Sequence, residues 1–130
     1  MSFLDSLESN LKNLEARSES ASDTARDRRR REKDRARMLA ESGNAERLRA
    51  SPFAGELLGH LTRMGYRTRT KVRMIWIGTT VRYEARDRRL ELRPTPEGLV
   101  AVFIDNMQER QRKPLSLDSD PEELAREWLG

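Results

Sequence analysis

A leucine stripe near the amino terminus is the first hydrophobic pattern in the chain. Its members are separated by three, four and three residues, which is the spacing of two coiled-coil heptads, and they are Leu4, Leu7, Leu11 and Leu14. In the same register, positions 18, 21 and 25 are serine or alanine and position 28 is arginine, so the stripe weakens and then ends. Two heptads cannot hold a lone helix in water, because nucleating a helix is costly. We therefore expect the stripe either to pair with a helix of another copy or a partner, or to dock on the rest of the chain.

Residues 1–43 are predicted to form a helical arm. The leucine and alanine seam occupies residues 2–25, and a basic run with eight basic and three acidic side chains occupies residues 26–37. Gly43 and Asn44 favour the left-handed conformation that ends many helices. The helix is therefore predicted to end near residue 41, and residues 44–50 are predicted to form a linker.

A second helix is predicted to open a small domain over residues 51–130. Serine as the cap and proline in the first helical position, Ser51 and Pro52, are a strong start signal. Apolar side chains from Phe53 to Met64 then fall on one helical face, and Gly65 stands where a terminating glycine is expected.

After Gly65 the hydrophobic period changes to two, which is typical of strands with one buried face. Residues 79–86 and 89–93 continue this alternation, residues 99–104 are apolar on both faces, and residues 107–113 are a candidate edge strand. The pattern predicts an antiparallel meander of four or five strands. In the first strand, uncharged side chains from Thr68 to Trp76 alternate with a basic row, which comprises Arg67, Arg69, Lys71 and Arg73.

The sequence Asp120-Pro121-Glu122-Glu123 predicts a last helix, with aspartate as the cap and proline in the first turn. Hairpins with terminal helices on one sheet face make a two-layer domain. The predicted fold class is therefore α+β: a long N-terminal helix, then a small domain of helix, antiparallel meander and C-terminal helix.

Composition adds information about the environment of the protein. Charged residues make up 37% of the chain, yet the net charge is only +4, so ion-paired faces and solubility come first and attraction of anions second. There is no cysteine, which fits a reducing compartment. Asp5 and Glu8 interrupt any secretory signal, and the longest apolar run, residues 99–104, is far too short to span a membrane. We expect a cytoplasmic protein without a membrane partner.

The sequence contains few residues in arrangements that are typical of catalytic sites. The single histidine, His60, borders the apolar face of its helix, and one histidine without cysteine does not make a catalytic triad or a zinc site. No glycine-rich phosphate loop is present, and most acids alternate with arginines, which keeps their pKa low. We expect no enzyme activity, cofactor, metal or small-molecule substrate.

Two basic features are candidates for binding an acidic partner. Arginine forks suit phosphate, but local pairs such as Asp27 with Arg31 would instead make the helix a solvated one. Likewise, the basic row of the first strand is either a platform for an acidic partner or a solvent face in which Glu84 and Glu91 pair with arginines across strands. The candidate residues of the helix are Arg28, Arg29, Arg30, Arg31, Lys33, Arg35 and Arg37, and those of the strand are Arg67, Arg69, Lys71 and Arg73.

These features favour a non-catalytic interaction or assembly protein. The leucine stripe would mediate self-association or association with a partner helix, and the arginine-rich sheet face would meet an acidic partner. The alternative is a nucleic-acid-binding protein that contacts phosphates through the basic helix and the basic strand row, largely without sequence specificity. The expected core position of Trp76 and Tyr83 leaves the sheet face without aromatic rings for stacking bases.

Overall fold

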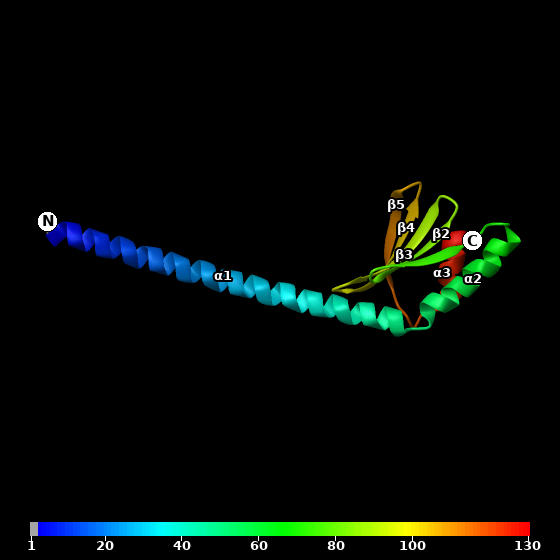
Figure 1. Ribbon diagram of the computed structural model, residues 1–130, viewed down its shortest axis with the longest axis horizontal. Coiled ribbons are helices and arrows are strands. Elements are labelled where there is room, and N and C mark those ends of the chain that lie inside the picture. The colour runs from blue at the N-terminus through cyan, green and yellow to red at the C-terminus, as the bar shows by residue number, and fades with distance from the viewer. Residues whose placement is uncertain (1–2) are drawn as a thin grey trace. The chain divides into compact units, whose positions relative to one another are not determined.

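The computed structural model describes residues 3–130, with side chains from residue 23 onward. It confirms the α+β fold with a long N-terminal helix, a five-stranded antiparallel sheet and a C-terminal helix (Figure 1). The chain divides into two units, Met1–Arg37 and Met38–Gly130. The elements are α1 (Phe3–Ala50), α2 (Phe53–Arg67), β1 (Arg73–Ile77), β2 (Thr80–Ala85), β3 (Arg88–Thr95), β4 (Gly98–Asp105), β5 (Gln108–Leu115) and α3 (Pro121–Leu129).

The five strands form a meander in which each strand pairs with the next, in the order β1-β2-β3-β4-β5. Tyr83, Leu90 and Phe103 lie opposite one another on neighbouring strands. Because side chains alternate along a strand, this register places the core residues of β2, β3 and β4 on one face, whereas the buried Glu91 and Val102 lie on the other. At the outer edge, a register shift between Phe103 and Ile104 interrupts the pairing of β4 with β5.

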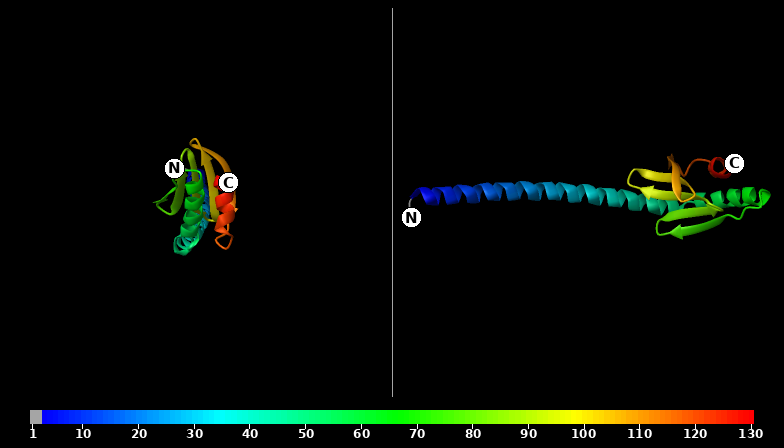
Figure 2. Two further views of the ribbon diagram at one scale, coloured as in Figure 1. Left: turned by 90° about the vertical axis from the view of Figure 1, so that its right-hand side faces the viewer. Right: turned by 90° about the horizontal axis from the view of Figure 1, so that it is seen from above.

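Helices α2 and α3 lie side by side and cover the apolar face of the sheet (Figure 2). The Tyr83 hydroxyl reaches across this core and donates a 2.7 Å hydrogen bond to the Ala54 carbonyl in α2. Burial raises the pKa of Tyr83 above its ordinary value. As predicted, Asp120 caps α3, accepting a hydrogen bond from the Glu122 N–H, and Trp128 on that helix is buried.

The predicted linker over residues 44–50 is wrong, because α1 continues as a helix to Ala50. Leu48 is fully buried in the core, and the buried Asn44 donates a 2.7 Å hydrogen bond to the Thr95 carbonyl. Tertiary packing of these two side chains outweighs the weak helix propensity of Gly43 and Asn44. The helix therefore does not end near residue 41.

The predicted strand from Thr68 is also wrong in its first half. Helix α2 runs on to Arg67, Arg69 adopts a left-handed φ of 55°, and β1 begins only at Arg73. Gly65 is the physical reason: a Cβ there would lie 2.3 Å from the Thr70 carbonyl oxygen, so glycine lets the chain fold back against the end of the helix. The Thr70 N–H seals this connection with a 2.7 Å hydrogen bond to the Gly65 carbonyl.

Candidate interaction surfaces

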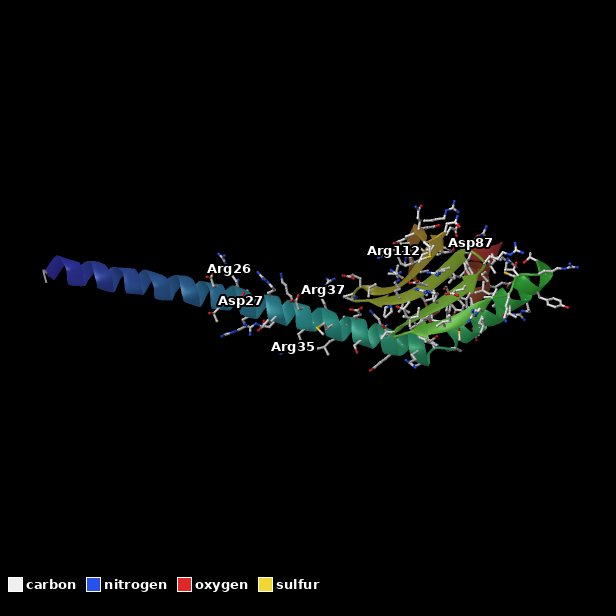
Figure 3. The ribbon with its side chains drawn as sticks, turned by 45° about the horizontal axis from the view of Figure 1, so that its top comes forward. Arg26, Asp27, Arg35, Arg37, Asp87 and Arg112 are labelled. Carbon is white, nitrogen blue, oxygen red and sulfur yellow. The ribbon has the colours of Figure 1, made fainter. Side chains whose placement is uncertain are left out.

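The basic run lies on a stretch of α1 that buries none of its side chains. Every residue from Asp23 to Gly43 is exposed, including Met38 at 69% and Leu39 at 68%. Figure 3 shows Arg26 and Arg37 on one side of this helix and Asp27 and Arg35 on the other. The structure therefore presents the charged side chains of the run to solvent around the helix.

The local ion pairs that the sequence suggested along this helix are not formed. Among the described side chains of residues 25–36, neither Asp27 nor Glu32 makes an ion pair with a neighbouring arginine. The guanidinium groups from Arg28 to Arg35 are therefore available to an anion. The side chains of the leucine stripe, in contrast, lie outside the described residues, so its pairing stays a prediction.

A second surface is the sheet face that points away from α2 and α3. Glu91 lies at its centre with a side chain only 5% exposed. Arg82 holds it from one side through an Nε–Oε2 distance of 3.0 Å, and Arg93 holds it from the other through an Nη2–Oε1 distance of 2.6 Å. Beside this cluster, Glu84 lies 3.7 Å from Arg82 and 3.9 Å from Arg89. These contacts confirm the predicted cross-strand pairing of Glu84 and Glu91.

The outer part of this face is also ion-paired. Arg112 contacts Glu109 at 2.8 Å, and the hydrogen bond and charge of Arg112, together with the charge of Arg93, hold the pKa of Glu109 below its usual value. Arg86 does not belong to the face, because it lies in the turn after β2 with a φ of 55°. By register the face carries five arginines and three glutamates: Arg73, Arg82, Arg89, Arg93 and Arg112 with Glu84, Glu91 and Glu109.

The basic strand row does not exist as a row. Arg67 ends α2, Arg69 and Lys71 lie in the connection to β1, and only Arg73 lies on the sheet. The structure instead brings Arg67, Arg69 and Lys71 together with Tyr66, around an open hollow at the end of α2. The helical period could have revealed Tyr66, because it falls outside the buried stripe that contains Phe53, Leu57 and Leu61.

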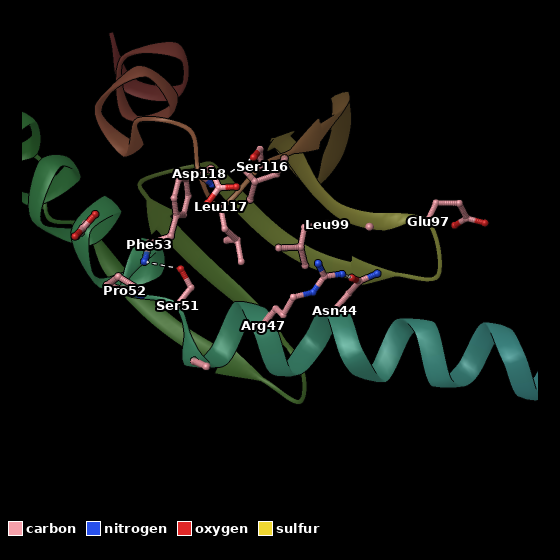
Figure 4. A pocket seen from close by; sticks show the side chains of 14 residues that line it. Asn44, Arg47, Ser51, Pro52, Phe53, Glu97, Leu99, Ser116, Leu117 and Asp118 are labelled. Carbon is pink, nitrogen blue, oxygen red and sulfur yellow. Dashed lines mark hydrogen bonds between the residues drawn. The ribbon is translucent and has the colours of Figure 1, made fainter.

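A hollow with a volume of about 790 Å³ lies between the end of α1, the start of α2 and the segment after β5 (Figure 4). Its serines serve local turns: Ser51 Oγ accepts from the Phe53 N–H at 3.2 Å, and Ser116 Oγ accepts from the Asp118 N–H at 3.3 Å. No histidine lines this hollow. The hollow therefore contains no serine–histidine pair.

The single histidine lies elsewhere, at the edge of α2. Arg63 Nη2 lies 3.0 Å from His60 Nδ1, so this nitrogen accepts when the ring is neutral. Within the described part of the chain, no three histidine, aspartate or glutamate side chains gather as metal ligands. In the same residues, no helix is long and apolar enough to cross a membrane.

Comparison with protein-family models, with curated proteins and with solved structures finds no match.

Proposed function

We propose that this chain is a non-catalytic interaction protein that assembles through helix α1 and presents its charged sheet face to an acidic partner. The observation that carries the proposal is the stretch of α1 from Asp23 to Gly43, in which every side chain is exposed. An isolated helix is marginal in water, and most helical stability comes from packing an apolar face. A helix with so long an exposed stretch is therefore expected to pair with another helix.

The positions of the apolar residues on α1 support pairing. Leu39 lies five heptads after Leu4, so it falls on the same seam as the leucine stripe. Its side chain is 68% exposed, and the adjacent Met38 is equally accessible. A partner helix would cover the leucine stripe at one end of this seam and Leu39 at the other. The positions between them are serine, alanine and charged residues.

The sheet face supports the second half of the proposal. Its five arginines exceed its three glutamates, so pairing leaves an excess positive charge of two. Glu91 holds Arg82 and Arg93 in place through ion pairs, so these arginines are already positioned before a partner binds. Because the excess charge is only two, a partner needs to supply few carboxylates.

The assembly is tested by mass and by helicity. Light scattering should give a multiple of 15.1 kDa for the wild type, and the circular dichroism signal at 222 nm should fall on dilution as the helices separate. The double variant Leu7→Glu, Leu11→Glu should shift the protein to 15.1 kDa and lower its helicity. The matched control Ser6→Glu, Asn13→Glu adds the same charges away from the seam and should keep the wild-type mass. A wild type of 15.1 kDa at all concentrations would refute the assembly.

A second candidate function is sequence-independent binding of nucleic acid by the basic run. The observation in its favour is that the guanidinium groups from Arg28 to Arg35 are exposed and make no ion pairs in the structure. Affinity for a DNA duplex should then fall by orders of magnitude between about 50 and 200 mM salt. The variant Arg28→Gln, Arg31→Gln should flatten this dependence, and a protein that binds no duplex at low salt would remove the candidate.

A further inference from the structure

Four basic side chains converge at the end of α2, separate from α1 and from the sheet face. An open hollow of about 430 Å³ is lined by Arg63 and Arg67 with His60, Met64, Glu122 and Arg126, and a second of about 490 Å³ is lined by Arg67, Arg69 and Lys71 together with Tyr66. Arg67 lines both hollows, so they form one continuous surface. We call Arg63, Arg67, Arg69 and Lys71, together with Tyr66, the α2-end patch.

The charge of the α2-end patch is not compensated. Among the described residues, none of its four basic side chains forms an ion pair, and Arg63 Nη2 lies 3.0 Å from His60 Nδ1. The neighbouring Arg126, in contrast, pairs with Glu122 at 2.8 Å. The partial negative charge at the carboxyl end of a helix helps to hold such cations without an acidic partner. The patch therefore carries four positive charges, as many as the net charge of the whole chain.

Tyr66 distinguishes this patch from the other basic surfaces. Its ring is 87% exposed and lines the second hollow with Arg67, Arg69 and Lys71. An exposed aromatic ring among cations offers a base a surface on which to stack, while the cations contact the phosphates on either side. An acidic peptide would use the cations but would have no need of the ring. A duplex keeps its bases stacked and would not use the ring either.

The patch is also held in shape before any ligand arrives. The Thr68 and Thr70 N–H groups both donate to the Gly65 carbonyl, at 3.2 Å and 2.7 Å, and pin the connection to the end of the helix. The backbone at Arg69 and Lys71 is thereby held close to the end of the helix that carries Tyr66. A preformed site loses less conformational entropy on binding than a flexible loop does.

We propose that the α2-end patch binds single-stranded nucleic acid, with Tyr66 stacking on one base and Arg63, Arg67, Arg69 and Lys71 contacting the flanking phosphates. Four phosphate contacts predict a slope of about −2.8 for the logarithm of affinity against the logarithm of salt concentration, at about −0.7 per contact. This binding does not depend on assembly through α1, so a monomeric protein would leave it intact.

Fluorescence anisotropy with a labelled fifteen-nucleotide oligothymidylate tests the proposal on the full chain. Tyr66→Ala should weaken binding about 5- to 150-fold, whereas Tyr66→Phe should bind as the wild type does. Arg67→Gln, Lys71→Gln should reduce the salt slope by about 1.4. The control Arg28→Gln, Arg31→Gln removes two cations from α1 and should leave the effect of Tyr66→Ala unchanged.

All of the substituted side chains are exposed, so thermal melting should show that each variant folds like the wild type. Equal affinity of the wild type and Tyr66→Ala for the oligonucleotide would overturn the proposal. It would also be overturned if the wild type bound only a duplex of the same length, or bound polyglutamate but not the oligonucleotide.

Discussion

Two polar side chains of the domain show how burial decides the role of a residue. The Tyr83 hydroxyl lies within the core with one partner, the Ala54 carbonyl. Glu91 lies on the uncovered sheet face and is nevertheless almost as buried, because Arg82 and Arg93 enclose it. Each is therefore a position at which one substitution removes a defined interaction.

Tyr83 predicts a loss of stability at high pH. Because burial raises its pKa in the folded protein, the unfolded chain releases the phenol proton first, from about pH 10. The free energy of unfolding is unaffected by this group below that pH, and it should fall by about 1.4 kcal/mol for each further unit up to pH 12. Urea unfolding at pH 7, 10, 11 and 12 measures the fall. Tyr83→Phe should be about 1–3 kcal/mol less stable at pH 7, since the Ala54 carbonyl loses its donor, and it should lack this part of the alkaline loss. The same alkaline loss in both proteins would contradict the assignment.

Substitutions of Glu91 and Glu109, which lie on the same sheet face, should have different effects on the free energy of unfolding. Glu91→Gln should lower the free energy of unfolding by about 1–3 kcal/mol, because it leaves two arginines beside an uncharged side chain. Glu109→Gln removes an exposed partner of Arg112 and should leave stability nearly unchanged. Chemical unfolding at pH 7 compares the two variants. Equal effects would show that burial of Glu91 does not strengthen its pairing.

Among the elements, α2 and its connection to β1 position the residues of the proposed nucleic-acid site. Ending the helix at Arg67 removes Arg67, Arg69 and Lys71 from the sheet and gathers them with Tyr66. The close approach of Thr70 to Gly65 makes this arrangement possible. The glycines of α2 therefore have different roles, although all lie in one helix.

Gly65 and Gly59 should respond in opposite ways to alanine. A Cβ at Gly65 would meet the Thr70 carbonyl oxygen, so Gly65→Ala should destabilise the protein by about 1–3 kcal/mol. Gly59 has no atom within 4 Å of such a Cβ and is exposed, so Gly59→Ala should stabilise the helix by about 0.5–1 kcal/mol. Thermal unfolding of the two variants decides this. If both substitutions stabilised the protein, the connection between α2 and β1 would have to move away from Gly65 without loss of stability.

The elements also show what the sequence could predict. Strands β2 and β3 followed from the alternation of apolar and polar residues, β4 followed from its continuous apolar run, and α3 followed from its Asp120 cap. The alternation of arginine and threonine after Gly65 was wrongly interpreted as a strand. The same alternation occurs here in a helix end followed by a turn, and only the packing of Thr70 on Gly65 distinguishes this arrangement from a strand. Leu48 and Asn44 extend α1 through contacts with distant residues, which local propensity does not contain. The α2-end patch was hidden for the same reason.

At the scale of the whole molecule, the first unit has an acidic segment followed by a basic one. Residues 1–25 carry five acids and two bases, whereas residues 26–37 carry eight bases and three acids. In a parallel pair of α1 helices the two basic runs would lie together and repel. In an antiparallel pair each basic run would approach the acidic segment of the other helix, which favours the antiparallel arrangement.

Spin labels measure the direction of pairing. With residues 3–43 overlapping in antiparallel, labels at Ser6→Cys should be about 50 Å apart, from a rise of 1.5 Å per residue. A parallel pair would bring them within about 20 Å, and such a distance would refute the antiparallel arrangement. Labels at Ser22→Cys, near the centre of the overlap, should be close together in either case and serve as the control.

Strand β5 forms one of the two edges of the sheet. Strand β5 is mostly exposed, carries Arg110, Arg112 and Lys113, and includes Pro114, which has no N–H to offer. The register shift between Phe103 and Ile104 also makes the pairing of β4 with β5 irregular. An edge of this kind is a poor template for a strand of a neighbouring molecule. The β5 edge is therefore not expected to add strands from neighbouring molecules in concentrated solution.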